Sequence, residues 1–182
     1  MQIAQNLAEL ERRIAAAAAR AGRWPQDIKL IAVSKTVPVE LIEQAIGAGI
    51  TAFGESRLQE AVPKVNLLRA KYPQINWHMI GHLQRNKVKQ ALEVFDLIHS
   101  VDSEKLAREI GIRGQGLGIR VPVLVEVNTC GEASKYGVPA EEAVALLKVM
   151  AGFDNIQVQG LMTIAPIVTD PGKARPYFTK LR

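Results

Sequence analysis

The chain has 182 residues and a mass of 19.9 kDa, with 48% hydrophobic and 23% charged side chains. This length and composition are ordinary for one globular domain over residues 1–182, and they exclude a disordered chain and one that spans a membrane. With 23 basic and 18 acidic residues the net charge is +5, which suits an anionic ligand or a nucleic-acid surface.

Two further features narrow the class of protein. The N-terminus shows no secretory signal pattern and Cys130 is the single cysteine, so we expect a cytoplasmic location. The basic residues are mostly scattered, and their densest group, Arg85, Lys87 and Lys89, has no interleaved aromatic residues. We therefore expect no nucleic-acid partner and instead a small phosphate-bearing ligand. We also expect a monomer that does not associate with membranes.

Apolar residues at the start of the chain recur with the spacing of one helical face: Ile3, Leu7, Leu10, Ile14 and Ala18. This stripe predicts a helix from about residue 3 to residue 21. Gly22 is expected to end the helix, and a Trp-Pro pair then begins the link to the first strand.

The stretch at 28–36, IKLIAVSKT, predicts a buried strand that ends in a lysine. Its apolar run on both faces is typical of a parallel strand covered on each side. A lysine at the end of such a strand has its ammonium group near apolar walls, and desolvation favours the neutral, nucleophilic amine. Lys35 is therefore a candidate Schiff-base lysine, and the alternative is a lysine that extends into water.

Strands and helices alternate through the rest of the chain. The expected strands follow at about 50–53, 76–83, 97–101, 121–127 and 156–164. The expected helices lie at about 38–47, 58–68, 85–92 and 139–150, with two more that begin near 104 and 171. Pro63 predicts a late start or a kink in its helix. Gly111, Gly114, Gly116 and Gly118 predict a flexible connector before the fifth strand.

This alternation predicts a parallel α/β fold, because each interval is long enough for one βαβ crossover. Two architectures compete, an open doubly wound sheet and a (β/α)₈ barrel with its site at the carboxyl ends of the strands. The G-Q-G-L-G run at 114–118 precedes a strand instead of linking a strand to a helix. We therefore interpret it as a plain loop and not as a dinucleotide-binding loop.

His78 and His82 are four residues apart, and on a helix this spacing would present both side chains to one metal ion. Pro73, Asn76 and Gly81 favour a strand, in which the two histidines would lie about 13 Å apart on one face. We expect no metal site, since zinc would also require a third ligand nearby.

The expected strand ends form a series of motifs: AVSKT at 32–36, FGESRLQE at 53–60, WHMIGHLQRNK at 77–87, HSVD at 99–102, VEVNTCGEASKYGV at 125–138 and GLMTIAP at 160–166. From about residue 28 to the end, this series closely resembles the pyridoxal 5′-phosphate homeostasis proteins, the YggS/PROSC family. The resemblance implies the (β/α)₈ TIM-type barrel of alanine racemases without their second domain. It also implies that pyridoxal 5′-phosphate is held as an internal aldimine, a Schiff base, on Lys35.

The resemblance further implies cofactor contacts at the mouth of the barrel. His82, Gln84 and Asn86 belong to one motif there, beside the cofactor. Asn128 and Met162 end the fifth and sixth strands and are expected to line the same mouth. For each of them the alternative is a role in the core or in holding a loop. The family usually has asparagine where this chain has Ser56, so we expect a contact from a shorter, hydroxyl-bearing side chain.

A larger departure lies at the C-terminus. The family continues through two more strands, which carry a phosphate loop and an arginine facing the pyridine nitrogen, whereas this sequence stops at Arg182. We therefore expect a barrel truncated after about six strands, which leaves two unpaired edges. A complete protein of this length would form an open barrel that binds the cofactor weakly, because a phosphate normally binds after strands seven and eight.

A racemase or decarboxylase needs a positioned acid or base in addition to the cofactor. The related racemases supply a tyrosine from a separate domain, which this chain lacks, and only Tyr136 lies on the expected rim. We therefore expect a carrier or regulator of the free cofactor pool without catalytic turnover. The alternative is a racemase or lyase that uses the same aldimine. A barrel aldolase without cofactor would need a second lysine or a carboxylate beside Lys35, which we do not identify.

Overall fold

The computed structural model describes residues 2–132 and 134–182. Its strands are β1 (Ala32–Val33), β2 (Ala52–Glu55), β3 (Asn76–Met79), β4 (Leu97–Val101), β5 (Val121–Asn128), β6 (Val138–Pro139) and β7 (Ile156–Met162). Its α-helices are α1 (Gln2–Arg20), α2 (Val39–Gly47), α3 (Leu58–Lys71), α4 (Val88–Val94), α5 (Glu104–Leu117), α6 (Ala143–Met150) and α7 (Arg175–Leu181). Short 3₁₀ turns are η1 (Pro25–Asp27), η2 (Arg85–Lys87), η3 (Ala140–Glu142) and η4 (Pro171–Ala174).

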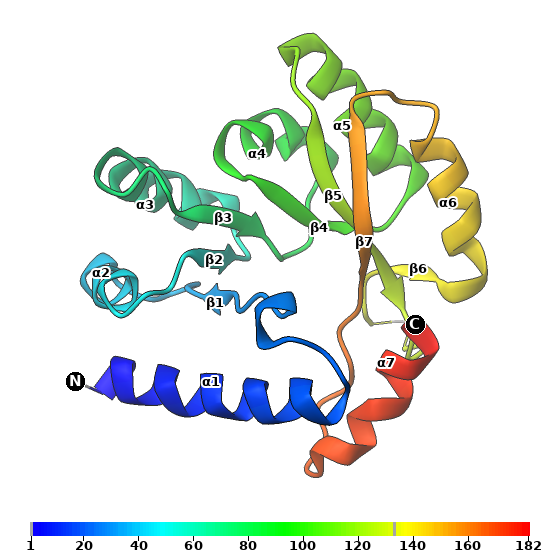
Figure 1. The fold of residues 1–182 in the computed structure, drawn as a ribbon. Coiled ribbons are helices and arrows are strands. Elements are labelled where there is room, and N and C mark those ends of the chain that lie inside the picture. The colour runs from blue at the N-terminus through cyan, green and yellow to red at the C-terminus, as the bar shows by residue number, and fades with distance from the viewer. Residues whose placement is uncertain (1, 133) are drawn as a thin grey trace.

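The strands form one parallel sheet in the order β1-β2-β3-β4-β5, with β7 also beside β5. The short β6 pairs with the end of β5, at Val127 and Asn128. The main strands thus follow one another in chain order, and helices α2 to α6 surround them on the outside (Figure 1). A doubly wound sheet would reverse its strand order partway. The arrangement therefore confirms the predicted barrel wall of about six strands.

The wall is open between its first and last strands. Among the described residues, β1 pairs only with β2 and β7 only with β5, as expected for six main strands. The first strand is shorter than its apolar run at 30–33, since β1 has two residues, and the predicted covering of both faces is wrong, because Val33 is 51% exposed. The edge position explains both differences, since an edge strand lacks a neighbour on one side.

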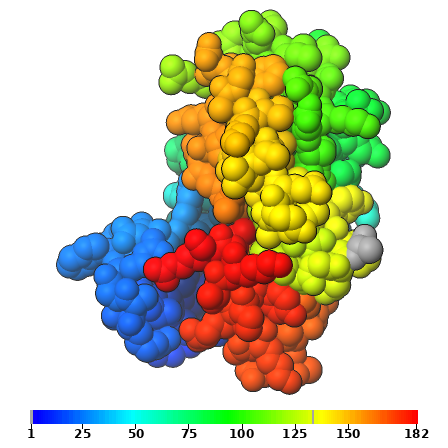
Figure 2. Space-filling view, turned by 90° about the vertical axis from the view of Figure 1, so that its right-hand side faces the viewer, coloured from blue at the N-terminus to red at the C-terminus, as the bar shows by residue number. Residues whose placement is uncertain are grey.

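Aromatic packing in the core joins neighbouring strands. Phe53 of β2 and Trp77 of β3 stack with ring centroids 5.4 Å apart, and both are almost fully buried. Figure 2 shows α7 at the surface, next to the end of β5. Leu181 of α7 is partly buried and packs against the core. None of the described helices combines the length and the hydropathy that a membrane crossing requires.

The glycine connector predicted before β5 is wrong, and so is the late start predicted for the helix that contains Pro63, whereas the alternative of a kink at Pro63 stays a prediction. Helix α3 begins at Leu58 and runs through Pro63, so its start is not delayed. Helix α5 runs through the glycines that predict a connector and ends only at Gly118, whose φ of 66° is left-handed. The glycine at position 111 has a packing role instead: a Cβ there would overlap the ring of Phe153, so a glycine in this helix lets the ring pack closely.

Two glycines of α5 provide a matched test of this explanation. We expect Gly111→Ala to lower the free energy of unfolding by about 1–3 kcal/mol, because the added methyl group overpacks against Phe153. Gly116→Ala should raise it by about 0.4–1 kcal/mol, since no neighbour lies within 4 Å of the added Cβ and alanine favours the helix. Urea unfolding of the two variants measures both changes, and equal effects would contradict the packing explanation.

Candidate functional site

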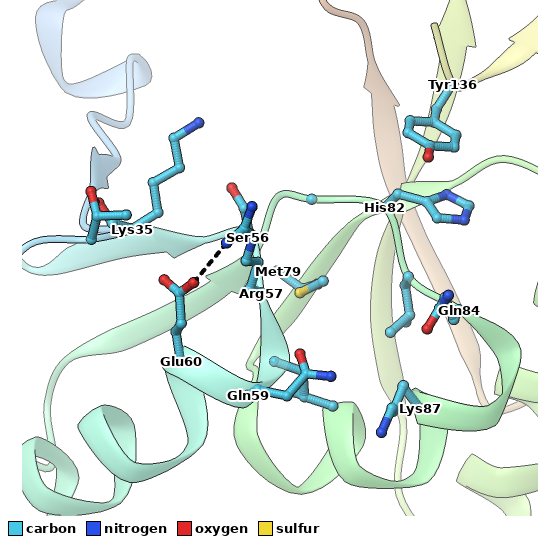
Figure 3. Close-up of a pocket in the computed structure, with 14 residues that line it drawn as sticks. Lys35, Ser56, Arg57, Gln59, Glu60, Met79, His82, Gln84, Lys87 and Tyr136 are labelled. Atoms are coloured by element: carbon cyan, nitrogen blue, oxygen red, sulfur yellow. Dashed lines mark hydrogen bonds and ion pairs between the residues drawn. The ribbon is translucent and has the colours of Figure 1, made fainter. Parts of the chain in front are cut away.

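A cleft of about 570 Å³ opens at the carboxyl ends of β1, β2 and β3. Lys35, Ser56 and His82 line it together, although they are far apart in the sequence (Figure 3). Asn128 lines a separate cavity of about 150 Å³, and Tyr136 borders both. Met162, the last residue of β7, is not among the described residues that line either cavity. The structure thus brings three of the five predicted contacts into one cleft.

The backbone turn that presents Lys35 is tightly held. The Ser34 N–H donates to the Gly54 carbonyl at 3.0 Å, and the Val37 N–H donates to the Ser34 carbonyl at 3.0 Å. Between them Thr36 has a φ of 61°, and its hydroxyl donates to the carbonyl oxygen of Lys35 at 2.6 Å. A threonine in the left-handed region is uncommon, and such a backbone persists only where its surroundings hold it. The fold therefore specifies how this lysine enters the cleft.

His82 connects two loops at the other side of the cleft. Its ring stacks on Tyr136 with centroids 3.9 Å apart and an interplanar angle of 11° (Figure 3). Its Nδ1 lies 3.3 Å from Oδ2 of Asp102, which follows β4. The loop after β3 thereby contacts the loop after β5. This wall combines an imidazole, a phenol and a carboxylate, so it can hold or move a proton beside the cleft.

The amide of Asn128 is engaged by its own loop. Its Nδ2 donates to the Glu132 carbonyl at 2.9 Å, while its Oδ1 accepts the Gly131 N–H at 2.9 Å and the Cys130 thiol at 3.2 Å. These bonds fix the turn that leads from β5 to β6. The geometry favours the loop-holding alternative for this residue, and its predicted cofactor contact stays a prediction.

We expect Asn128→Ala to lower the free energy of unfolding by about 1–2 kcal/mol, because several loop hydrogen bonds lose their partner. The loop should open more often, so trypsin should cleave after Lys135 several times faster than in the wild-type protein. The control is Asn66→Ala at an exposed position of α3. An unchanged cleavage rate in Asn128→Ala would show that the amide does not hold the loop.

Two buried groups near the middle of the wall have shifted pKa values that the sequence reasoning did not predict. His78 Nδ1 lies 2.8 Å from His99 Nε2, and burial, with smaller effects of His99 and Lys29, lowers the pKa of His78 to about 4. Burial, then the Asp102 carboxylate, raises the pKa of Glu126 to about 7. The detectable signal for Glu126 was a charged residue inside a run of valines in β5.

The histidines that could suggest a metal ion have different neighbours. His78 pairs with His99, whereas His82 pairs with Asp102. Within residues 2–132 and 134–182, no group of three histidine, cysteine, aspartate or glutamate side chains is arranged to hold a metal ion.

Comparison with known proteins identifies the family. The family model of the alanine racemase N-terminal domain matches residues 5–182. A pyridoxal phosphate homeostasis protein of Aquifex aeolicus is 42% identical over 182 residues, which are 100% of this chain and 79% of that protein. One of Vibrio alginolyticus is 39% identical over 181 residues, or 98% of this chain and 78% of that protein. The chain belongs to the pyridoxal phosphate homeostasis protein family.

Solved structures agree with this family assignment. An unknown protein from Bifidobacterium adolescentis has a TM-score of 0.91 at 38% identity, covering 98% of this chain and 76% of that one. PipY of Synechococcus elongatus, solved with PLP bound, has a TM-score of 0.82 at 33% identity, covering 98% of this chain and 78% of that one. An alanine racemase of Clostridium difficile, 17% identical with a TM-score of 0.67 over 85% of this chain and 42% of its own, shares the fold. The predicted family and its racemase-type barrel are confirmed.

Proposed function

We propose that this chain binds pyridoxal 5′-phosphate through Lys35 and serves the homeostasis of this cofactor. The observation that carries the proposal is the place of Lys35, whose amine-bearing side chain follows β1 and lines a cleft shared with the ends of β2 and β3. PipY, which is 33% identical, has been solved with PLP bound. The relatives named for homeostasis of the cofactor support the cellular role.

The residues of the cleft suit the chemical groups of this cofactor. The aldehyde of the cofactor can condense with an amine, and Lys35 supplies one. Arg57 and Lys87 also line the cleft and outnumber its carboxylate, Glu60, which favours a phosphate group. Met79 adds an apolar surface of the kind on which an aromatic ring packs. The cleft can therefore hold an aromatic, anionic aldehyde.

The other predicted contacts are part of the same proposal. Ser56 and His82 line the cleft and would contact the cofactor from the loops after β2 and β3. Asn128 and Met162 would contact it from the ends of β5 and β7. The cytoplasmic location, the monomeric state and the lack of a nucleic-acid partner expected from the sequence also belong to this proposal.

We propose a carrier without catalytic turnover. The side chains beside the cleft nevertheless give a reason to test for racemase or lyase activity. His82, Asp102 and Tyr136 form an acid–base group beside the cleft that contains Lys35. The purified protein should therefore be incubated with amino acids and the cofactor. Turnover that is lost in Lys35→Ala would overturn the carrier proposal and favour the enzyme.

The direct test of binding is reduction with borohydride after incubation with pyridoxal 5′-phosphate, followed by peptide mapping. The expected result is one reduced adduct, on the peptide that contains Lys35. An adduct on another lysine, or none, would refute the proposed attachment.

A further inference from the structure

A buried hydrogen-bond network lies directly before Lys35 in the chain. Glu55, at the end of β2, is fully buried, and Ser34 is 2% exposed. The Ser34 hydroxyl donates to Oε1 of Glu55 at 2.7 Å. The Lys64 ammonium of α3 donates to the same oxygen at 2.7 Å and to the Ser34 carbonyl at 2.8 Å. One cation thus joins β2, α3 and the residue that precedes the candidate binding lysine.

The network acts on both sides of the turn that presents Lys35. The Ser34 carbonyl accepts from the Lys64 ammonium and from the Val37 N–H, so it anchors the turn at its start and at its end. Thr36, inside this turn, has the left-handed φ of 61°. An uncommon backbone conformation needs such outside contacts to persist. Hydrogen bonds that involve charged groups are the stronger ones for this purpose.

The composition of the network fits a role in geometry better than a role in stability. A buried ion pair contributes little net stability compared with apolar residues of the same volume. In addition, Oε2 of Glu55 is buried without a hydrogen-bond partner among the described residues. A buried polar atom in this state is uncommon and calls for an explanation. A pair that orients the backbone at a reactive side chain supplies one.

We propose that Lys64 and Glu55 are positioning residues that fix the backbone of Ser34 and thereby orient the Lys35 amine for reaction with an aldehyde. This inference rests on the proposed binding of pyridoxal 5′-phosphate by Lys35. It adds two residues that do not line the cleft and that act through the peptide backbone.

The test compares Lys64→Met and the double variant Glu55→Gln/Lys64→Met with the wild-type protein. The single variant leaves the Glu55 carboxylate buried without its cation, which lowers stability. The double variant removes both charges at similar volume, so it should fold while still lacking the bond to the Ser34 carbonyl. Lys71→Met is the matched control, because Lys71 also lies on α3 and pairs with Glu43 at 2.6 Å, but in an exposed position.

Three quantities are measured: urea unfolding, amide hydrogen exchange at Val37 without cofactor, and the apparent Kd for pyridoxal 5′-phosphate from borohydride-trapped adduct. In the double variant we expect a folded protein, exchange at Val37 about tenfold faster and a Kd about tenfold higher. Lys71→Met should match the wild-type protein in exchange and in Kd.

The outcomes separate the two proposals. A wild-type protein that forms no adduct refutes the proposed function, and this inference with it. A wild-type adduct that forms equally well in the double variant refutes the inference alone. Weaker binding without faster exchange at Val37 also refutes it, because the backbone at the turn would then not be the cause.

Discussion

Lys35→Ala is expected to lose the reducible adduct with pyridoxal 5′-phosphate and to weaken binding by at least about a hundredfold, or about 2.7 kcal/mol. The reason is chemical, since alanine has no amine to condense with the aldehyde. The fold should change little, because Lys35 is exposed at the end of an edge strand. Spectra of the protein with cofactor, before and after borohydride reduction, measure the loss.

Thermal unfolding gives a second measure of the same change. A ligand at a hundred times its Kd raises the free energy of unfolding by about 2.7 kcal/mol. We therefore expect added cofactor to raise the Tm of the wild-type protein and to leave that of Lys35→Ala almost unchanged. Lys89→Ala is the control, an exposed lysine of α4 that does not line the cleft. A full adduct in Lys35→Ala would overturn the proposed function.

Glu126→Gln is expected to stabilise the protein at pH 8 by up to about 3 kcal/mol and to have little effect near pH 4.5. The folded state raises the pKa of Glu126 from 4.5 to about 7, first by burial and then by the Asp102 carboxylate. Between these pH values the folded protein holds a proton that the unfolded chain releases. Stability contributed by the protonated carboxyl is therefore lost as the pH rises, and glutamine avoids this loss.

His78 should change the free energy of unfolding in the opposite direction over nearly the same pH range. Its folded pKa is about 4 against 6.5, so the unfolded chain takes up a proton first and stability falls as the pH drops from 6.5 to 4. The two groups thus offset each other in the wild-type protein. In Glu126→Gln this compensation is absent. The free energy of unfolding should therefore fall by about 3 kcal/mol as the pH drops from 6.5 to 4.

Urea unfolding between pH 4 and pH 8 measures both effects. Glu141→Gln, at an exposed position of η3, is the control and should follow the wild-type curve. A constant difference between Glu126→Gln and the wild-type protein at all pH values would show that Glu126 does not titrate as its environment indicates.

The amino-acid sequence was enough to predict the order of helices and strands and the barrel class. It also singled out Lys35 as the lysine at the end of the first strand. These features depend on patterns within short stretches, such as the alternation of apolar strands with helices and the lysine at the end of one strand. The series of strand-end motifs also predicted the family, which the comparisons confirm. The fifth strand and the helix at 139–150 were predicted closely for the same reason.

Other features depended on contacts between distant parts of the chain. Gly111 lies inside a helix, where its missing side chain leaves room for the ring of Phe153 from a later loop. Glu55 becomes a partner of Lys64 only when α3 packs on the strands, and Glu126 comes under the influence of Asp102 only when β4 and β5 are neighbours. Burial and charge at these positions are set by packing in three dimensions, which no local pattern encodes.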